Sequence, residues 1–203
     1  MKHVNLLIER YPNLKCVKDD VVKAINVIVD SYNAGGKVLL CGNGGSASDC
    51  EHISGEFLKG FLSKRPIADG EYETISGVAR EKLQKGIPAI PLTSLTALVS
   101  AFSNDVDAEW TYAQMVFALG KKGDVFIGLS TSGNAKNVRF GAETAKALGM
   151  TTISLTGEKE NPLSNASDIA IRVPETETFK VQELHLPVYH AICAEVENIL
   201  FGN

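Results

Sequence analysis

The sequence predicts an α/β protein built on an open parallel sheet with helices on both faces. Short apolar runs alternate with segments of helical periodicity, which is the order of elements typical of a parallel sheet. The runs are continuously apolar, as in strands that helices cover on both faces. We expect strands at 37–41, 87–92, 124–130, 151–156 and 169–173.

The helical segments carry apolar residues at three- and four-residue spacings. Residues 14–33 follow this pattern and end at the sequence NAGG, and residues 134–149 end at a glycine, which favours a left-handed helix C-terminus. Residues 179–201 have the longest apolar periodicity and predict a closing helix, in which Pro187 marks a bend or an early turn.

The length of the chain predicts a single domain over residues 1–203, with one substantial core. Within it, residues 1–35 form an N-terminal helical arm. Residues 61–86 are polar and interrupt the alternation of strands and helices. We therefore expect them to be an excursion from the sheet, partly helical near 77–85.

Composition excludes several classes of protein. Hydrophobic residues make up 44% and charged residues 22% of the chain, as in ordinary globular proteins. The net charge of -4 argues against a nucleic-acid partner, which requires a basic face. No apolar run is long enough to span a membrane, and the N-terminus resembles neither a signal peptide nor a transit sequence, so we expect a cytoplasmic protein with no membrane partner. The cysteines are scattered without a CxxC pair, and we expect them to be small buried residues: Cys16, Cys41, Cys50 and Cys193.

A glycine-rich loop, GNGGSAS at 42–48, follows the first strand. Ligands of such sheets bind at the carboxyl ends of the strands. Glycines permit close approach of an anion to the backbone, and the amides of a helix start favour negative charge. The same residues are about equally consistent with a plain helix start capped by Ser46 or Ser48.

A second polar loop, LSTSGNAKN at 129–137, follows a later strand. Ser130, Thr131 and Ser132 offer three hydroxyls beside a glycine at the start of a helix, more than one helix cap needs, which favours a phosphate site. The loop is neither a P-loop nor a dinucleotide fingerprint, because GxxxxGK[ST] and a GxGxxG after the first strand are absent.

Two helices carry candidate metal-binding or proton-transfer residues. His52 and Glu56 are four residues apart and share a helix face, where they could hold a metal ion, transfer a proton or form an ordinary surface pair. Gln182 and His190 lie about 12 Å apart along a straight helix and about 80° around it. This separation strains their convergence on one ion, so either both lean inward or one serves a neighbouring subunit. His185 is expected to be structural or to support a ligand.

The motifs CGNGGSASDCEHISGEF, GLSTSGN and VQELHLPVYH, in this order, resemble those of the phosphoheptose isomerases of the SIS (sugar isomerase) fold. The resemblance covers most of residues 14–200 except 61–86. It implies a three-layer α-β-α sandwich with a five-stranded parallel sheet in flavodoxin-like order, preceded by N-terminal helices. It also implies a homotetramer with active sites at subunit interfaces.

The activity implied by the resemblance is the interconversion of D-sedoheptulose 7-phosphate and D-glycero-D-manno-heptose 7-phosphate through an enediol(ate), the first step of bacterial nucleotide-heptose synthesis. Glu56 is the implied base and His190 the implied acid. One zinc ion per subunit is implied, with ligands at His52, Glu56, Gln182 and His190. The implied substrate-binding residues are Asn43, Gly44, Gly45, Ser46, Ser94, Ser130, Thr131, Ser132 and Gln182.

The chain departs from familiar members of this family at several positions. Ala135 replaces a serine, Ser94 an aspartate and Gly60 an arginine, although Lys59 is adjacent. Upstream of Gln182, Phe179 and Lys180 occupy a stretch where the family has an acidic or polar residue. Two alternatives therefore stay open: an isomerase of another phosphosugar, and a non-catalytic SIS protein such as a sugar-phosphate sensor or a replication-initiator-binding protein. The presence of all four implied ligands favours the enzyme, because a scaffold does not need them.

Overall fold

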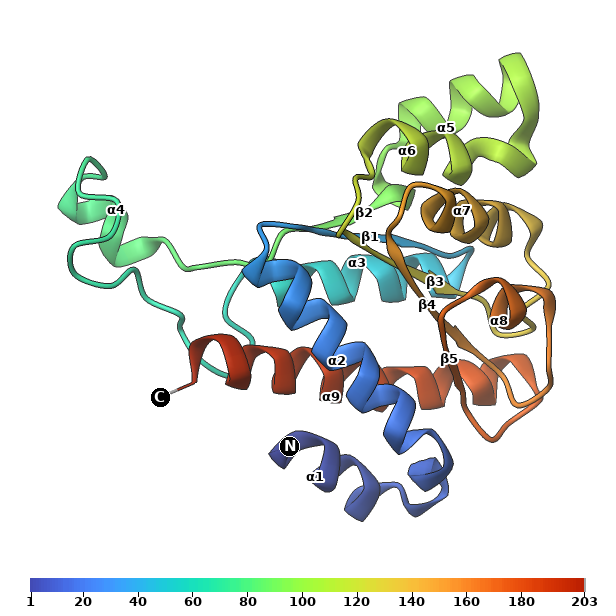
Figure 1. The fold of residues 1–203 in the computed structure, drawn as a ribbon, viewed down its shortest axis with the longest axis horizontal. Coiled ribbons are helices and arrows are strands. Elements are labelled where there is room, and N and C mark those ends of the chain that lie inside the picture. Colours follow the sequence, from blue (N-terminus) through green and yellow to red (C-terminus); the bar gives the residue numbers. More distant parts are fainter. Residues whose placement is uncertain (203) are drawn as a thin grey trace.

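A computed structural model describes residues 1–202 and confirms the α/β class (Figure 1). Five parallel strands form one sheet in the order β2-β1-β3-β4-β5, the flavodoxin-like order that the sequence motifs imply. Strand β4 has the predicted bounds, and the others are shorter than predicted by one to three residues. The strands are β1 Val38–Cys41, β2 Ala89–Pro91, β3 Val125–Leu129, β4 Thr151–Thr156 and β5 Ile169–Arg172.

Helices precede, separate and follow the strands. The α-helices are α1 Lys2–Arg10, α2 Lys18–Asn33, α3 Gly45–Leu58, α4 Gly77–Lys82, α5 Thr96–Phe102, α6 Thr111–Leu119, α7 Lys136–Ala147, α8 Pro162–Ala166 and α9 Thr178–Phe201. Short 3-10 turns are η1 Pro12–Val17, η2 Leu92–Ser94 and η4 Ala108–Trp110, and a π-helical turn is η3 Ser103–Asp107.

Two helix predictions need correction. The helix predicted over 14–33 is divided into η1 and α2, with Asp19 and Asp20 in the first turn of α2, where carboxylates complement the helix dipole. Helix α9 runs through Pro187, which is therefore not an early-turn residue. A proline removes one backbone hydrogen bond, and the buried residues on both sides of it, Val181 and Val188, pack into the core.

The sheet separates two apolar cores, which confirms the three-layer sandwich. All of β3 is buried: Val125, Ile127 and Leu129 face a core shared with α1, α2, α3 and α9, whereas Phe126 faces a second core shared with α6, α7 and α8. Successive residues of a strand point to opposite faces, so a strand covered on both faces must be apolar throughout. Because the strands are parallel, the loops that follow β1, β2 and β3 lie at the same, carboxyl end of the sheet.

The excursion carries α4 on a long loop that stands away from the body (Figure 1). Its helix lies within the predicted 77–85. Arg65 fixes its base: the guanidinium is fully buried, and Nε donates to Oε1 of Glu197 on α9 at 2.6 Å. Arg65 also donates to the backbone carbonyls of Phe57 at 2.7 Å and Glu56 at 3.0 Å, at the end of α3. Glu197 in turn accepts hydrogen bonds from three backbone N–H groups of the excursion, those of Phe61, Leu62 and Ser63.

The N-terminal helix docks on α9 through a second buried carboxylate. Glu195 accepts hydrogen bonds from the backbone N–H groups of His3 at 2.6 Å and Val4 at 3.3 Å, the free donors of the first turn of α1. Within residues 1–202, no helix has the length and apolar character needed to cross a bilayer. Cys16 corrects the expectation for the cysteines, because η1 leaves it exposed while the other three are buried.

The ion pair between Arg65 and Glu197 gives a prediction for stability. Glu197→Gln leaves the guanidinium buried without a counter-charge, so the free energy of unfolding should fall by about 3–5 kcal/mol. Glu109→Gln is the matched control, because it removes an exposed pair with Lys136 (2.9 Å) and should cost at most about 1 kcal/mol. Urea denaturation at neutral pH measures both. Equal losses in the two variants would contradict the prediction.

The same pair predicts how this stability depends on pH. Burial by itself raises the pKa of Glu197, but hydrogen bonds from Phe61 and Leu62 and the Arg65 pair outweigh it and hold the pKa below its ordinary value. A carboxylate whose pKa is lowered by folding stabilises the protein above its unfolded pKa, and the contribution disappears as pH falls through the folded pKa. The stability gap between the parent chain and Glu197→Gln should therefore narrow on acidification.

Candidate active site

The loop after β1 takes its shape from a glycine and a tyrosine. Gly44 has a φ of +56°, in the left-handed region that favours glycine. It is the N-cap residue of α3, so the alternative that Ser46 or Ser48 caps this helix is wrong. Ser46 is instead buried in the first turn of α3. Tyr112 of α6 donates its hydroxyl proton to the carbonyl of Gly42 at 2.8 Å and holds the loop against the second core.

Asn43 ties this loop to the helix that follows the second loop. Its Nδ2 donates to Oδ1 of Asn137 at 2.9 Å, and Nδ2 of Asn137 returns a bond to Oδ1 of Asn43 at 3.0 Å. Oδ1 of Asn137 also accepts the backbone N–H of Val138 at 3.0 Å, inside the first turn of α7. The two loops are thus held side by side. Asn137 and Tyr112 were not predicted from the sequence, because the helical patterns that carry them give no sign of these distant partners.

Gly45 admits the side chain of Gln182 to the start of α3. A Cβ at Gly45 would lie 2.3 Å from Nε2 of Gln182, so the amide reaches this place only because the residue is glycine. Nε2 of Gln182 donates to Oδ2 of Asp49 at 3.2 Å. Gln182 therefore lies at the start of α3, where its amide contacts Asp49, one turn before His52.

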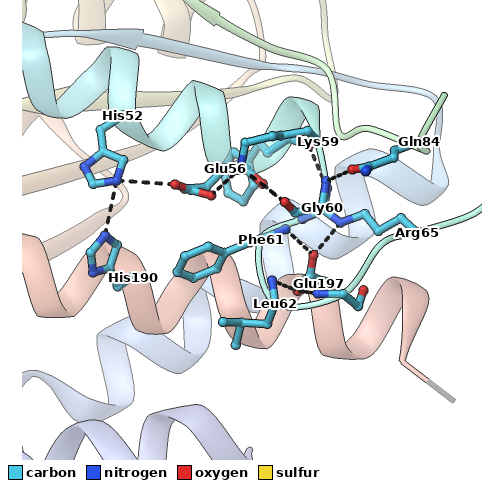
Figure 2. A network of polar contacts seen from close by, with 12 residues as sticks. His52, Glu56, Lys59, Gly60, Phe61, Leu62, Arg65, Gln84, His190 and Glu197 are labelled. Atoms are coloured by element: carbon cyan, nitrogen blue, oxygen red, sulfur yellow. Dashed lines mark hydrogen bonds and ion pairs between the residues drawn. The ribbon is translucent and has the colours of Figure 1, made fainter. Parts of the chain in front are cut away.

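His52, Glu56 and His190 do come together, from two helices (Figure 2). Nε2 of His52 lies 3.4 Å from Oε1 of Glu56 and 3.4 Å from Nε2 of His190. The other oxygen of Glu56 lies 3.2 Å from Nζ of Lys59. Burial lowers the pKa of His190, and the neighbouring His52 lowers it further against the opposing effect of Glu56.

Two residues that were not predicted from the sequence support this group. The hydroxyl of Tyr189 lies 3.0 Å from Nδ1 of His52 and 3.2 Å from Oδ1 of Asp49. Burial raises the pKa of Asp49 against the opposing hydrogen bonds of Tyr189 and Gln182. The sequence carried one signal for both: each is a polar residue at a buried position of its helix, Asp49 one turn before His52 and Tyr189 next to His190. His185 is fully buried, and burial lowers its pKa to about 4, as expected of a structural histidine.

The donor atoms of this group fit a zinc ion in chemistry and, in part, in spacing. Imidazole nitrogen and carboxylate oxygen are common zinc ligands, and neighbouring ligand atoms of a tetrahedral site lie about 3.4 Å apart. The pairs that His52 makes with Glu56 and His190 have this spacing. Across the part of the chain that the structure describes, no group of three or more His, Cys, Asp or Glu side chains is placed so that it could hold a metal ion. Gln182, the fourth implied ligand, is held by Asp49.

The loop after β3 presents its hydroxyls to different degrees. Ser130 is buried, Thr131 half-buried and Ser132 exposed. Gly133 has a φ of +67°, and a Cβ there would lie 2.0 Å from the side chain of Asn161, so the turn requires glycine. Helix α7 begins at Lys136, two residues later than predicted, so the hydroxyls precede the helix by a short loop.

Ser94 reaches the same region from the end of β2. Its Oγ donates to Oε1 of Glu51 on α3 at 3.0 Å, and both side chains are exposed. Residues from the loops after β1, β2 and β3 and from α9 therefore border one open edge of the sheet. This edge combines a candidate phosphate loop, amide and hydroxyl groups, and a histidine–carboxylate group.

Comparison with known proteins places the chain among enzymes of one kind. The SIS domain family matches residues 7–157. The phosphoheptose isomerase of Burkholderia pseudomallei is 40% identical over 182 residues, which cover 90% of this chain and 83% of the relative. The solved phosphoheptose isomerase of Francisella tularensis has a TM-score of 0.79 and 28% identity, covering 93% of this chain and 91% of that one. That of Neisseria gonorrhoeae has a TM-score of 0.77 and 28% identity, covering 97% and 96%.

The parallel sheet, with polar loops gathered at its carboxyl edge, defines a sugar isomerase domain. Within that class, the chain belongs to the phosphoheptose isomerase family. This confirms the family resemblance of the three sequence motifs.

The close approach at Gly45 gives a prediction with a control in the same helix. Gly45→Ala should push the Gln182 amide away from Asp49, because the new Cβ takes its place. Gly55→Ala meets nothing within 4 Å and should leave that contact intact while stabilising α3 by about 0.5–1 kcal/mol. Crystal structures and urea denaturation of both variants measure this. A Gln182 side chain unmoved in Gly45→Ala would refute the assignment.

Proposed function

We propose that the protein is an aldose–ketose isomerase that interconverts D-sedoheptulose 7-phosphate and D-glycero-D-manno-heptose 7-phosphate through an enediol(ate). The observation that carries this proposal is the convergence of Glu56, His52 and His190 at the open edge of a sheet, in a chain 40% identical to a phosphoheptose isomerase. The reaction is assigned to the cytoplasm, as the first step of bacterial nucleotide-heptose synthesis, on the strength of the shared sequence motifs.

Proton transfer between C1 and C2 of the sugar needs a base and an acid, which we assign to Glu56 and His190. Glu56 suits the role of base because its side chain is only 15% exposed and its second oxygen is held by Lys59. The lowered pKa of His190 makes its protonated ring a stronger acid toward the sugar oxygen. Groups of this kind each contribute about 10²- to 10⁴-fold to the rate.

The far end of the sugar is assigned to the loop after β3. Ser130, Thr131 and Ser132 would bind the phosphate, while Asn43, Gly44, Gly45, Ser46, Ser94 and Gln182 line the sugar side. Support comes from the paired amides of Asn43 and Asn137, which hold the two loops next to each other. Binding energy from a fixed phosphate orients the reacting carbons, so this loop affects rate as well as affinity.

One zinc ion per subunit is part of the proposal, held by His52, Glu56, Gln182 and His190. The support is the nitrogen and oxygen donor set and the spacing of its two closest pairs. A bound zinc ion would supply Lewis-acid polarisation of the sugar carbonyl. The chain's own residues supply the proton transfers and the orientation of the substrate.

A homotetramer with active sites at subunit interfaces also belongs to the proposal. A groove of about 350 Å³ lies between α1, α9 and the base of the excursion, and His190 lines it. Leu6, Leu62 and Leu186 are exposed along this groove. A second chain packed there would bury these side chains and close the site on the side of His190.

The assembly is tested by its mass in solution. Sedimentation equilibrium at assay concentration should give the mass of four chains, each of 21.8 kDa. Leu186→Asp places a charge in the groove and should weaken the assembly and the activity together. Full activity in a strictly monomeric protein would contradict a shared site.

A second candidate is an isomerase of another phosphosugar. Ser94, where the family has an aspartate, donates to Glu51, and Ala135 brings no hydroxyl to the phosphate loop. Ser94 and Ala135 lie in the loops that we assign to the substrate, whereas His52, Glu56 and His190 are unchanged. A non-catalytic sugar-phosphate sensor or replication-initiator-binding protein is less favoured, because it has no use for the His52, Glu56 and His190 group.

One assay separates these functions. The purified protein is incubated with sedoheptulose 7-phosphate and with pentose and hexose phosphates, before and after chelation and zinc replacement. We expect turnover of the heptulose, lost on chelation and restored by zinc. Glu56→Gln and His190→Gln should each lower kcat by about 10²- to 10⁴-fold, whereas Glu143→Gln, on the exposed side of α7, should not. No turnover of any sugar phosphate with zinc supplied would refute the enzyme.

A further inference from the structure

We infer that Tyr189 is a positioning residue, whose hydroxyl oxygen holds His52 in the tautomer with the proton on Nδ1 and thereby turns the Nε2 lone pair toward Glu56 and His190. The inference rests on the proposed function, because it explains how one of its reacting groups is prepared. The role of Tyr189 follows from hydrogen-bond directions alone, and it can be tested without any assay of turnover.

With Asp49 ionised, the directions of the bonds around Tyr189 leave a single arrangement. The hydroxyl carries one proton and lies 3.2 Å from Oδ1 of Asp49 and 3.0 Å from Nδ1 of His52. A phenol keeps its proton near neutral pH. A carboxylate only accepts hydrogen bonds, so Tyr189 donates to Asp49 and its oxygen accepts from His52. Nδ1 of His52 therefore carries the proton, and Nε2 carries the lone pair.

Asp49 is fixed as an acceptor by its second contact. Its other oxygen, Oδ2, accepts a hydrogen bond from Nε2 of Gln182 at 3.2 Å, so both oxygens are occupied by donors. Asp49 is 9% exposed and Tyr189 only 2%, so little water competes for these groups. One buried carboxylate thus orients the Gln182 amide directly and the His52 ring through Tyr189.

The Tyr189 ring also fixes the orientation of both histidines. It packs edge-on against His52, with centroids 5.5 Å apart, and against His190, with centroids 5.0 Å apart. Removing only the hydroxyl keeps these ring contacts and deletes the acceptor for Nδ1. Oε1 of Glu56, 3.4 Å from Nε2 of His52, then becomes the nearest acceptor and draws the proton to Nε2. The lone pair would turn away from the reacting group.

The tautomer is measured directly by long-range ¹H–¹⁵N NMR on the full chain labelled in its histidine rings and stripped of metal by a chelator. The chain has four histidines, so His52→Gln assigns the His52 signal. At a pH where the ring is neutral, we expect the Nδ1-protonated form in the parent chain. We expect the Nε2-protonated form to dominate in Tyr189→Phe. Tyr32→Phe, which removes a hydroxyl from α2, is the control and should match the parent chain.

Zinc affinity gives a second readout that does not depend on turnover. Losing the hydrogen-bond partner of a ligating histidine typically costs 10- to 100-fold in metal affinity. Competition with a chromophoric chelator should show about this loss for Tyr189→Phe and none for Tyr32→Phe. An Nε2-protonated His52 in the parent chain, or an unchanged tautomer in Tyr189→Phe, would overturn the inference. A chain without isomerase activity but with the expected tautomers would refute the proposed function and leave the role of Tyr189 intact.

Discussion

The geometry of the site depends on one buried ion pair, between Arg65 and Glu197. Arg65 donates to the carbonyls of Glu56 and Phe57 in the last turn of α3. Its partner Glu197 lies on α9, two turns after His190. Compared with apolar residues of similar volume, a buried pair of this kind adds little net stability, but it tolerates only one relative placement of its partners. The helix of the assigned base and the helix of the assigned acid are therefore locked together, and the excursion is anchored at the same point.

Helix α9 contacts α1, α3 and the base of the excursion. Its buried face carries Gln182 and Tyr189 toward α3, and its last turns carry Glu195 toward α1 and Glu197 toward the excursion. A long helix keeps these side chains at fixed separations of 1.5 Å per residue. Gln182 therefore meets the start of α3, and His190 meets its last half.

The two loops at the sheet edge show a different constraint, in which small residues make room for functional ones. Gly45 leaves space for the Gln182 amide, and Gly133 leaves space for Asn161, the capping residue of α8. In both places a Cβ would overlap the neighbouring side chain. The loop that we assign to phosphate is thus shaped by an asparagine that belongs to another element, beyond the next strand.

The sequence by itself determined the class of fold, the positions of the strands and the family. These follow from local patterns: continuous apolar runs, helical spacing, and motifs in a fixed order. His52 and Glu56 could also be paired in advance, because a helix places residues four apart on one face. His190 joins them only in the tertiary structure, where Gln182 contacts Asp49.

Only the tertiary structure decided what surrounds these residues. Asp49, Tyr189, Asn137 and Arg65 act through partners far away in the chain, and no periodicity reveals such pairings. In the folded chain, Pro187 lies within a continuous helix, because packing overrides the low helix propensity of proline. Cys16 is exposed. Local patterns fix which residues share a face of one element, whereas the contacts between elements, which set hydrogen-bond directions and burial, exist only once the chain is folded.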